Sequence, residues 1–201
     1  MNIGIDKFGL AIPEYFLDIR DLAVARNENA NKFLKGLLQL EMSVSPVTQD
    51  IVTLGAAAAH EFLTEEDRQK IDMIIIGTET GVDQSKSASV FIHNLLGIQP
   101  FTRCVEIKEA CYGATAGLDF AKNYIEKNPD SYVLLIAADI AKYGIETSGE
   151  STQGSGSCAM LIKKDPNILI LNNDNVCQTR DIMDFWRPNY SAFPYVDGHF
   201  S

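Results

Sequence analysis

The feature that most constrains the fold is a short apolar run, DMIIIG at residues 72–77, that ends in a glycine. A strand with one wet face alternates apolar and polar side chains, whereas a continuous apolar run is typical of a strand buried on both faces. Strands of that kind belong to parallel or mixed sheets that helices cover. We therefore expect a layered α/β domain.

The rest of the chain alternates between helix and strand patterns around this run. Helices are expected at 18–26, 30–37, 48–63, 87–96 and 112–127. Strands are expected at 2–11, 72–77, 103–108, 131–138, 157–163, 167–171 and 174–179, with an aromatic and proline-rich loop from 184 onward. The sequence has no short repeat and no linker, so residues 1–201 are expected to fold as one domain.

Composition excludes several functions. The formal net charge of −10 opposes nucleic-acid binding, which needs clustered Lys and Arg. No leader pattern opens the chain and no run approaches the roughly 18 apolar residues of a membrane span, so we expect no membrane contact and a cytoplasmic location. The four cysteines, at 104, 111, 158 and 177, lack the spacing of zinc sites or disulfide frameworks. We expect reduced thiols and no metal.

Cys111 differs from the other cysteines, which lie in apolar, strand-like runs where a cysteine is ordinarily a small buried residue. It lies where a strand gives way to a helix, in KEACYGATAG at 108–117. Amides at a helix amino terminus favour a thiolate and can bind the oxyanion of a thioester carbonyl. On this pattern alone, Cys111 is either an acyl-accepting nucleophile or a core cysteine.

Glu79 directly follows the buried strand, in GTET at 77–80. Ligands of α/β sheets gather at the carboxyl ends of strands, where Glu79 and Cys111 are both expected. A carboxylate removed from water becomes a better base for taking a proton from carbon. A solvated glutamate is the commoner alternative, but the two residues together favour catalysis. The glycine- and serine-rich loop at 144–156 lacks a nucleotide-triphosphate motif, so a phosphate site and a plain surface loop both remain open.

Six stretches carry a resemblance to a known family: GTET, EIKEACYGATAG, AADIAKYG, STQGSGSCAMLI, DFWRP and YVDGHFS, in this order. Together they resemble the amino-terminal half of bacterial 3-hydroxy-3-methylglutaryl-CoA (HMG-CoA) synthases, of the thiolase superfamily, over essentially all 201 residues. The resemblance implies a thiolase-like half with a mixed sheet and a buried helix after the nucleophile. Thiolases and ketoacyl synthases share the cysteine junction but not the surrounding stretches.

The resemblance also implies a reaction, the condensation of acetyl-CoA with acetoacetyl-CoA in the mevalonate route to isoprenoids. Cys111 would carry the acetyl group, and Glu79 would remove a methyl proton from it. The two CoA thioesters are substrates, and no further cofactor is implied. A homodimer paired through its amino-terminal sheets is expected.

Further residues are implied at the substrate. The acyl and pantetheine channel would include Tyr143, Thr152, Phe185 and Ser201, and the nucleotide end of CoA would lie near Asn29, Ala30 and Lys32. The family usually has a proline-threonine pair here, and this chain has Ser151 and Thr152. The replacement of proline by Ser151 does not remove the hydroxyl group of Thr152.

The family's catalytic histidine comes from a second half, and His60, His93 and His199 do not stand in its motif. We therefore expect a fragment that alone is catalytically incomplete and exposes an apolar face. Two alternatives remain: a thiolase or ketoacyl-synthase type of enzyme, which would not depend on Glu79, and a non-catalytic module for acyl binding or dimerisation.

Overall fold

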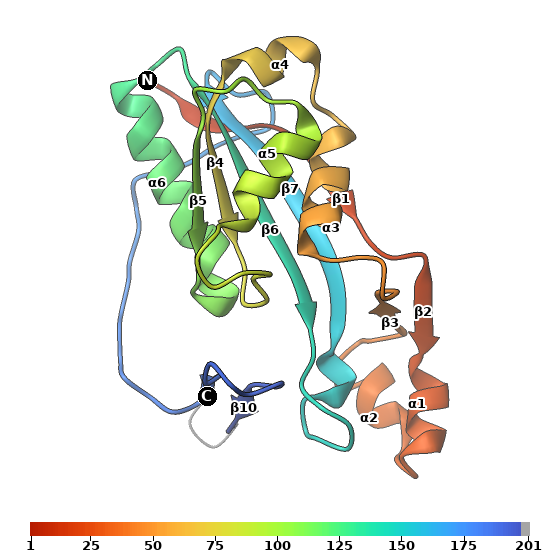
Figure 1. Ribbon diagram of the computed structural model, residues 1–201. Helices are drawn as coiled ribbons and strands as arrows, with labels where there is room; N and C mark the ends of the chain where they lie inside the picture. The colour runs from red at the N-terminus through yellow and green to blue at the C-terminus, as the bar shows by residue number, and fades with distance from the viewer. Residues whose placement is uncertain (198–201) are drawn as a thin grey trace. The chain divides into compact units, whose positions relative to one another are not determined.

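Figure 1 shows the computed structural model, which describes residues 1–197. The chain forms two compact units, each assembled from three segments. Unit 1 comprises Met1–Ile12, Val47–Asp139 and Gly156–Asn173. Unit 2 comprises Pro13–Pro46, Ile140–Ser155 and the chain from Asp174 onward. Within residues 1–197, no helix is both long and apolar enough to cross a bilayer.

Unit 1 is built on a six-stranded sheet with the order β5-β4-β6-β7-β1-β8. The strands are β1 (Ile3–Ala11), β4 (Ile71–Gly77), β5 (Arg103–Ile107), β6 (Tyr132–Ala141), β7 (Gly154–Lys164) and β8 (Leu169–Ile170). β4 runs parallel to both β5 and β6, whereas β1 is antiparallel to β7 and β8. The predicted mixed sheet is confirmed. Ile74, Ile75 and Ile76 of β4 are fully buried, as the apolar run predicts.

Helices cover both faces of the sheet (Figure 1). They are α3 (Ile51–His60), α4 (Glu65–Lys70), α5 (Ala88–Leu96) and α6 (Gly113–Lys127). Gly55 of α3 packs against Ile136 of β6, and Gly117 of α6 packs against Leu135 of the same strand. Neighbouring residues of a strand point to opposite faces. α3 and α6 therefore lie on opposite sides of the sheet, which makes unit 1 a three-layer α/β/α structure.

Local signals explain where these helices begin and end. Asp50 accepts a hydrogen bond from the Thr53 amide (2.8 Å) and its own amide donates to Thr53 Oγ1 (3.0 Å), a capping box that starts α3. α5 ends at Gly97, whose φ of 61° is the left-handed conformation that glycine adopts most easily. The helix at 30–37 is shorter than predicted and ends at Leu34.

Unit 2 contains α1 (Ile19–Ala25), α2 (Ala30–Leu34) and two short strand pairs. β2 (Tyr15–Asp18) pairs with β3 (Glu41–Val44), and β9 (Phe185–Trp186) pairs with β10 (Tyr195–Val196). The Asp18 side chain accepts a hydrogen bond from the Arg20 amide and so caps α1, as the sequence predicts. Ile19, Leu22, Ala23 and Phe33 form the apolar cluster between α1 and α2.

Two predictions for the end of the chain are wrong. The strand expected at 174–179 is absent, and Cys177 within it is exposed instead of buried. The loop expected from 184 contains the β9–β10 pair, in which the rings of Trp186 and Tyr195 stack with centroids 5.2 Å apart. The segment 174–179 reads DNVCQT and has only two apolar residues, too few to hold a strand against a buried surface.

Candidate active site

The end of β4 lies directly against the start of α6. A methyl group on Gly77 would lie 2.2 Å from the Ala114 amide nitrogen, so only glycine allows this approach. The next residue, Thr78, donates its amide hydrogen to the Ile107 carbonyl at the end of β5 (3.2 Å). These contacts bring the segment that carries Glu79 beside the segment that carries Cys111, as the strand-end argument predicts.

Cys111 occupies a tight turn between β5 and α6. The turn is a 3-10 helix, η1 (Ala110–Tyr112), and it begins with a φ of 35° at Ala110. Residues with a Cβ rarely adopt this left-handed conformation, and it is found disproportionately at functional sites. The Cys111 side chain is exposed, which excludes the core-cysteine alternative. The thiol is therefore accessible to a substrate.

The amides that follow Cys111 are used inside the turn. The N–H groups of Tyr112 and Gly113 both donate to the Glu109 carbonyl, at 2.8 Å and 3.0 Å. The sequence pattern indicates that leading amides of a helix can bind an oxyanion, but in this structure these two N–H groups are already donated to a carbonyl. An oxyanion formed on the Cys111 thioester needs other donors.

Asp139, near the end of β6, organises the turn that carries Glu79. Its Oδ1 atom accepts hydrogen bonds from the Thr78 hydroxyl (2.8 Å), the Glu79 amide (2.8 Å), and the amide and hydroxyl of Thr80 (3.2 and 2.9 Å). One carboxylate oxygen thus fixes three consecutive residues. The Oε2 atom of Glu79 is buried in this arrangement, which is the desolvation that a carboxylate base requires.

Sequence reasoning missed Asp139, although the stretch AADIAKYG that contains it was noticed. The available signal was the same as for Glu79: a carboxylate at the end of an otherwise apolar strand. Within the described residues, no group of three or more His, Cys, Asp or Glu side chains could hold a metal ion.

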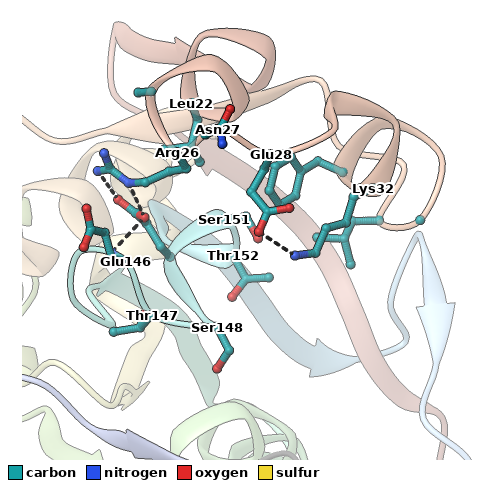
Figure 2. Close-up of a pocket in the computed structure, with 15 residues that line it drawn as sticks. Leu22, Arg26, Asn27, Glu28, Lys32, Glu146, Thr147, Ser148, Ser151 and Thr152 are labelled. Atoms are coloured by element: carbon teal, nitrogen blue, oxygen red, sulfur yellow. Dashed lines mark hydrogen bonds and ion pairs between the residues drawn. The ribbon is translucent and has the colours of Figure 1, made fainter.

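Unit 2 contains a cavity of about 660 Å³ between the α1–α2 segment and the loop at 146–152 (Figure 2). Two of the residues that the resemblance places at CoA, Lys32 and Thr152, line this cavity. Asn29 and Ala30 are not among the lining residues. The Asn29 side chain instead accepts a hydrogen bond from the Asn31 amide (3.0 Å) and caps α2, of which Ala30 is the first residue.

An ion pair joins the two walls of the cavity. Arg26 donates from Nε to Glu150 Oε2 (2.8 Å) and from Nη2 to Oε1 (2.7 Å), and the Glu146 amide donates to Oε2 (3.0 Å). The hydrogen bonds from Arg26 lower the pKa of Glu150 below its usual value. Lys32 makes a longer contact with Glu28 (3.2 Å), and both side chains are exposed.

Tyr143 and Phe185 contact each other edge to face in unit 2, with ring centroids 6.0 Å apart. The amide of Tyr143 donates to Gln153 Oε1 (2.7 Å), and the Tyr143 ring packs on Gly149, where a Cβ would lie 3.1 Å from it. Gln153 therefore fixes the backbone of Tyr143 through this hydrogen bond, and it is a second residue that sequence reasoning missed. Ser201 and His199 lie outside the described residues.

The mixed sheet, the exposed cysteine at a strand-to-helix junction and the helix packed behind it define a thiolase-like protein. The family described as hydroxymethylglutaryl-coenzyme A synthase, N terminal, matches residues 1–167, and the chain belongs to this family. Hydroxymethylglutaryl-CoA synthase of Enterococcus faecalis is 55% identical over all 201 residues, which are 52% of its own length. A polyketide-biosynthesis 3-hydroxy-3-methylglutaryl-ACP synthase of Bacillus subtilis, PksG, is 31% identical over 94% of this chain and 48% of its own.

Solved structures agree with this assignment. An HMG-CoA synthase complexed with CoA matches 99% of this chain and 51% of its own, with 60% identity and a TM-score of 0.97. The protein MvaS in complex with 3-hydroxy-3-methylglutaryl coenzyme A matches 98% of this chain and 49% of its own, with 37% identity and a TM-score of 0.93. The chain thus spans about half the length of the relatives it matches.

Proposed function

We propose that this chain supplies the acyl-carrying half of an enzyme that condenses acetyl-CoA with acetoacetyl-CoA to 3-hydroxy-3-methylglutaryl-CoA. The observation that carries the proposal is the exposed Cys111 thiol at the strand-to-helix junction, beside the strand end that carries Glu79. Family membership and the relatives that bind CoA and HMG-CoA support the choice of substrates.

The reaction begins with acyl transfer. The Cys111 thiolate attacks the carbonyl carbon of acetyl-CoA, the bond from that carbon to the CoA sulfur breaks, and CoA leaves as a thiol after taking up a proton. Glu79 then removes a proton from the methyl group of the acetyl thioester. Covalent capture on Cys111 divides one difficult condensation into easier steps. No cofactor is needed beyond the two thioester substrates.

Carbon–carbon bond formation follows. The carbanion attacks the ketone carbon of acetoacetyl-CoA, and the ketone oxygen takes a proton from a general acid. By resemblance to the family, this acid is a histidine of the half that the chain does not span. Water finally cleaves the thioester on Cys111, which frees the product as a carboxylate and restores the thiol.

The cavity of unit 2 is proposed to take the CoA part of the substrates. Lys32 offers a cation to phosphate, and Ser151 and Thr152 offer hydroxyl groups from the facing loop (Figure 2). CoA is favoured over an acyl carrier protein because the CoA-dependent relative is 55% identical and the ACP-dependent one 31%. The other substrate contacts that the resemblance implies remain predictions: Tyr143, Phe185, Asn29, Ala30 and Ser201.

A homodimer, a cytoplasmic location and a role in the mevalonate route are further proposals that rest on family membership. The fold offers one support for the dimer: β5 is an edge strand of the unit 1 sheet, and no strand within residues 1–197 pairs with its outer side. Sedimentation of the full-length protein at micromolar concentration tests it, and a monomer would contradict it.

Covalent labelling tests the proposed function. In the full-length protein, radiolabelled acetyl-CoA should label the native enzyme and the Glu79→Ala variant, but not Cys111→Ala. Glu79→Ala should then fail to form product from acetoacetyl-CoA. Cys177→Ser is the matched control, because Cys177 is the other exposed thiol within residues 1–197, and it should label normally. Folded protein without label on Cys111 would favour the non-catalytic module, and normal condensation by Glu79→Ala would favour a thiolase-type enzyme.

A further inference from the structure

The ion pair between Arg26 and Glu150 is more enclosed than a surface salt bridge. The Glu150 side chain is only 9% exposed, and its two oxygens accept three hydrogen bonds, two from Arg26 and one from the Glu146 amide. A buried carboxylate is tolerated when it is paired and hydrogen-bonded in this way. The planar guanidinium makes two parallel bonds, which fix direction as well as distance.

This pair connects chain segments that are 124 residues apart. Arg26 directly follows α1 and caps its carboxyl end, where its amide donates to the Leu22 carbonyl (3.0 Å). Glu150 begins the 3-10 helix η2 (Glu150–Thr152), which carries Ser151 and Thr152 on the cavity wall. Figure 2 shows the guanidinium reaching from the α1 side to the loop side of the cavity. The pair therefore sets the distance between the two walls.

The pair also gives different roles to Arg26 and Lys32, two cationic residues that line the cavity. The charge of Arg26 is already neutralised by two short bonds to an enclosed carboxylate. The Lys32 ammonium lies 3.2 Å from the Glu28 carboxylate and 5.8 Å from the centroid of the Phe33 ring, and exposed contacts of these kinds are weak. Lys32 can thus turn to an incoming anionic group, whereas Arg26 stays in the wall.

We propose that Arg26 and Glu150 are positioning residues for the CoA thioester. Their ion pair holds the loop at 146–152 at the distance from α1 that the substrate needs. This inference rests on the proposed function. The pair takes no part in the chemistry at Cys111. Disrupting it should therefore weaken substrate binding and leave the rate of the bound substrate unchanged.

The test is a titration of the full-length protein with radiolabelled acetyl-CoA, in which the initial rate of Cys111 acetylation is measured. Arg26→Lys keeps the charge but loses the two-pronged geometry, and Glu150→Gln keeps the shape but loses the charge. Each variant should raise the half-saturating concentration of acetyl-CoA about tenfold, which is the effect expected if the loop at 146–152 holds its binding-competent position only about a tenth of the time. The saturated rate should stay within twofold of native. The reversed pair, Arg26→Glu with Glu150→Arg, should bind better than either reversal alone.

Asp67→Asn is the matched control, because Asp67 forms an equally enclosed ion pair with Lys7 (2.7 Å, Asp67 side chain 7% exposed) in unit 1. It should lower the thermal midpoint without changing the half-saturating concentration. If Arg26→Lys and Glu150→Gln behave like Asp67→Asn, or lower the saturated rate instead, the inference is wrong. If the Glu150→Gln variant does not fold, Arg26→Lys alone provides the test. A native protein that takes no label at any concentration would contradict the proposed function itself.

Discussion

Single carboxylates organise both parts of the proposed machinery, each by accepting several hydrogen bonds at once. Asp139 fixes the turn at 78–80 from one oxygen atom, and Glu150 accepts one hydrogen bond from its own loop at 146 and two from Arg26. A carboxylate that accepts several bonds acts as a rigid joint, because moving any one donor leaves a charged acceptor partly unsatisfied. The position of Glu79 therefore depends on a residue that needs no contact with substrate.

Asp139→Asn tests this dependence. The amide keeps the shape of the side chain but offers a neutral acceptor, so the turn at 78–80 loses its charge-assisted hydrogen bonds. We expect the condensation rate of the full-length protein to fall roughly 10-fold to 100-fold, which corresponds to about 1.4–2.8 kcal/mol of transition-state stabilisation. Asp130→Asn, at an exposed turn, is the control and should leave the rate unchanged. An Asp139→Asn enzyme with the native rate would show that the turn holds Glu79 without this carboxylate.

The ion pair of Glu150 gives a pH dependence with a defined sign. Because Arg26 lowers the pKa of Glu150 in the folded state, the pair stabilises the protein fully above the pKa of an unfolded glutamate, about 4.3. That stabilisation decreases as the pH falls through the lower, folded-state pKa. The thermal midpoint of the native protein should therefore drop more steeply between pH 5 and pH 3, roughly, than that of Glu150→Gln. Parallel curves for the two proteins would contradict this prediction.

At the scale of elements, the close packing of β4 against α6 brings together the segments that carry the two proposed catalytic residues. Gly77 lies so close to Gly113 and Ala114 that a Cβ would overlap backbone atoms, which cannot move aside as a flexible side chain can. The same close packing continues at Gly117, where a Cβ would lie 2.5 Å from the Leu135 side chain. Small residues thus let α6 lie directly on the strand beside Glu79.

Gly77→Ala should separate these elements. We expect it to destabilise the protein by about 1–3 kcal/mol, the usual effect of overpacking, and to slow acetylation of Cys111 because the turn before α6 must shift. Denaturant unfolding and acetyl-CoA labelling measure the two effects. Gly156→Ala is the matched control, since its Cβ would lie 3.5 Å from the nearest atom, an ordinary contact. Equal stability of the two variants would contradict the tight joint.

Elements with a strong local signal were predicted from the sequence, and elements that depend on tertiary packing were not. The run at 72–77, the cap at Asp18 and the stop at Gly97 each carry their signal within a few residues. α4 was missed because its sequence, EEDRQK, has no apolar face, and only the capping box between Thr64 and Asp67 marks its start. The short strands β2 and β3 form because they pair with each other, although 22 residues (19–40) separate them in sequence, and no local pattern reveals such a pairing.

The candidate site divides in the same way. Cys111 and Glu79 were predicted because each stands within a few residues of the end of a recognisable strand. The residues that were missed act through hydrogen bonds to other parts of the chain, and a sequence pattern does not show which segments come close in space. They are Asp139, Gln153 and the Arg26–Glu150 pair. The resemblance to the family supplied Lys32 and Thr152, which do line one cavity, but not the ion pair that fixes its width.

At the scale of the whole molecule, unit 1 leaves part of one sheet face uncovered. Gly9 of β1 faces α3, where a Cβ would lie 2.2 Å from the Ala58 carbonyl, so its neighbours Phe8 and Leu10 point to the opposite face. They are 53% and 61% exposed. Adjacent exposed apolar side chains on a sheet are typical of a surface that another part of the protein or another chain covers. We expect the part of its relatives that this chain does not span to cover it.

Phe8→Ser with Leu10→Ser should therefore have opposite effects in two lengths of the protein. In residues 1–201 alone, the apolar face drives self-association, and the double variant should raise the dissociation constant about tenfold or more, because two large apolar side chains no longer leave water. In a protein that carries the part of the relatives that this chain does not span, we expect the same face to be covered, and the variant should lower the free energy of unfolding by roughly 2–5 kcal/mol. Sedimentation and denaturant unfolding measure the two quantities. Phe101→Ser, at a position that is 87% exposed, is the control and should change neither. If the double variant leaves the full-length protein as stable as native, this face is open in the complete molecule and the remaining half lies elsewhere.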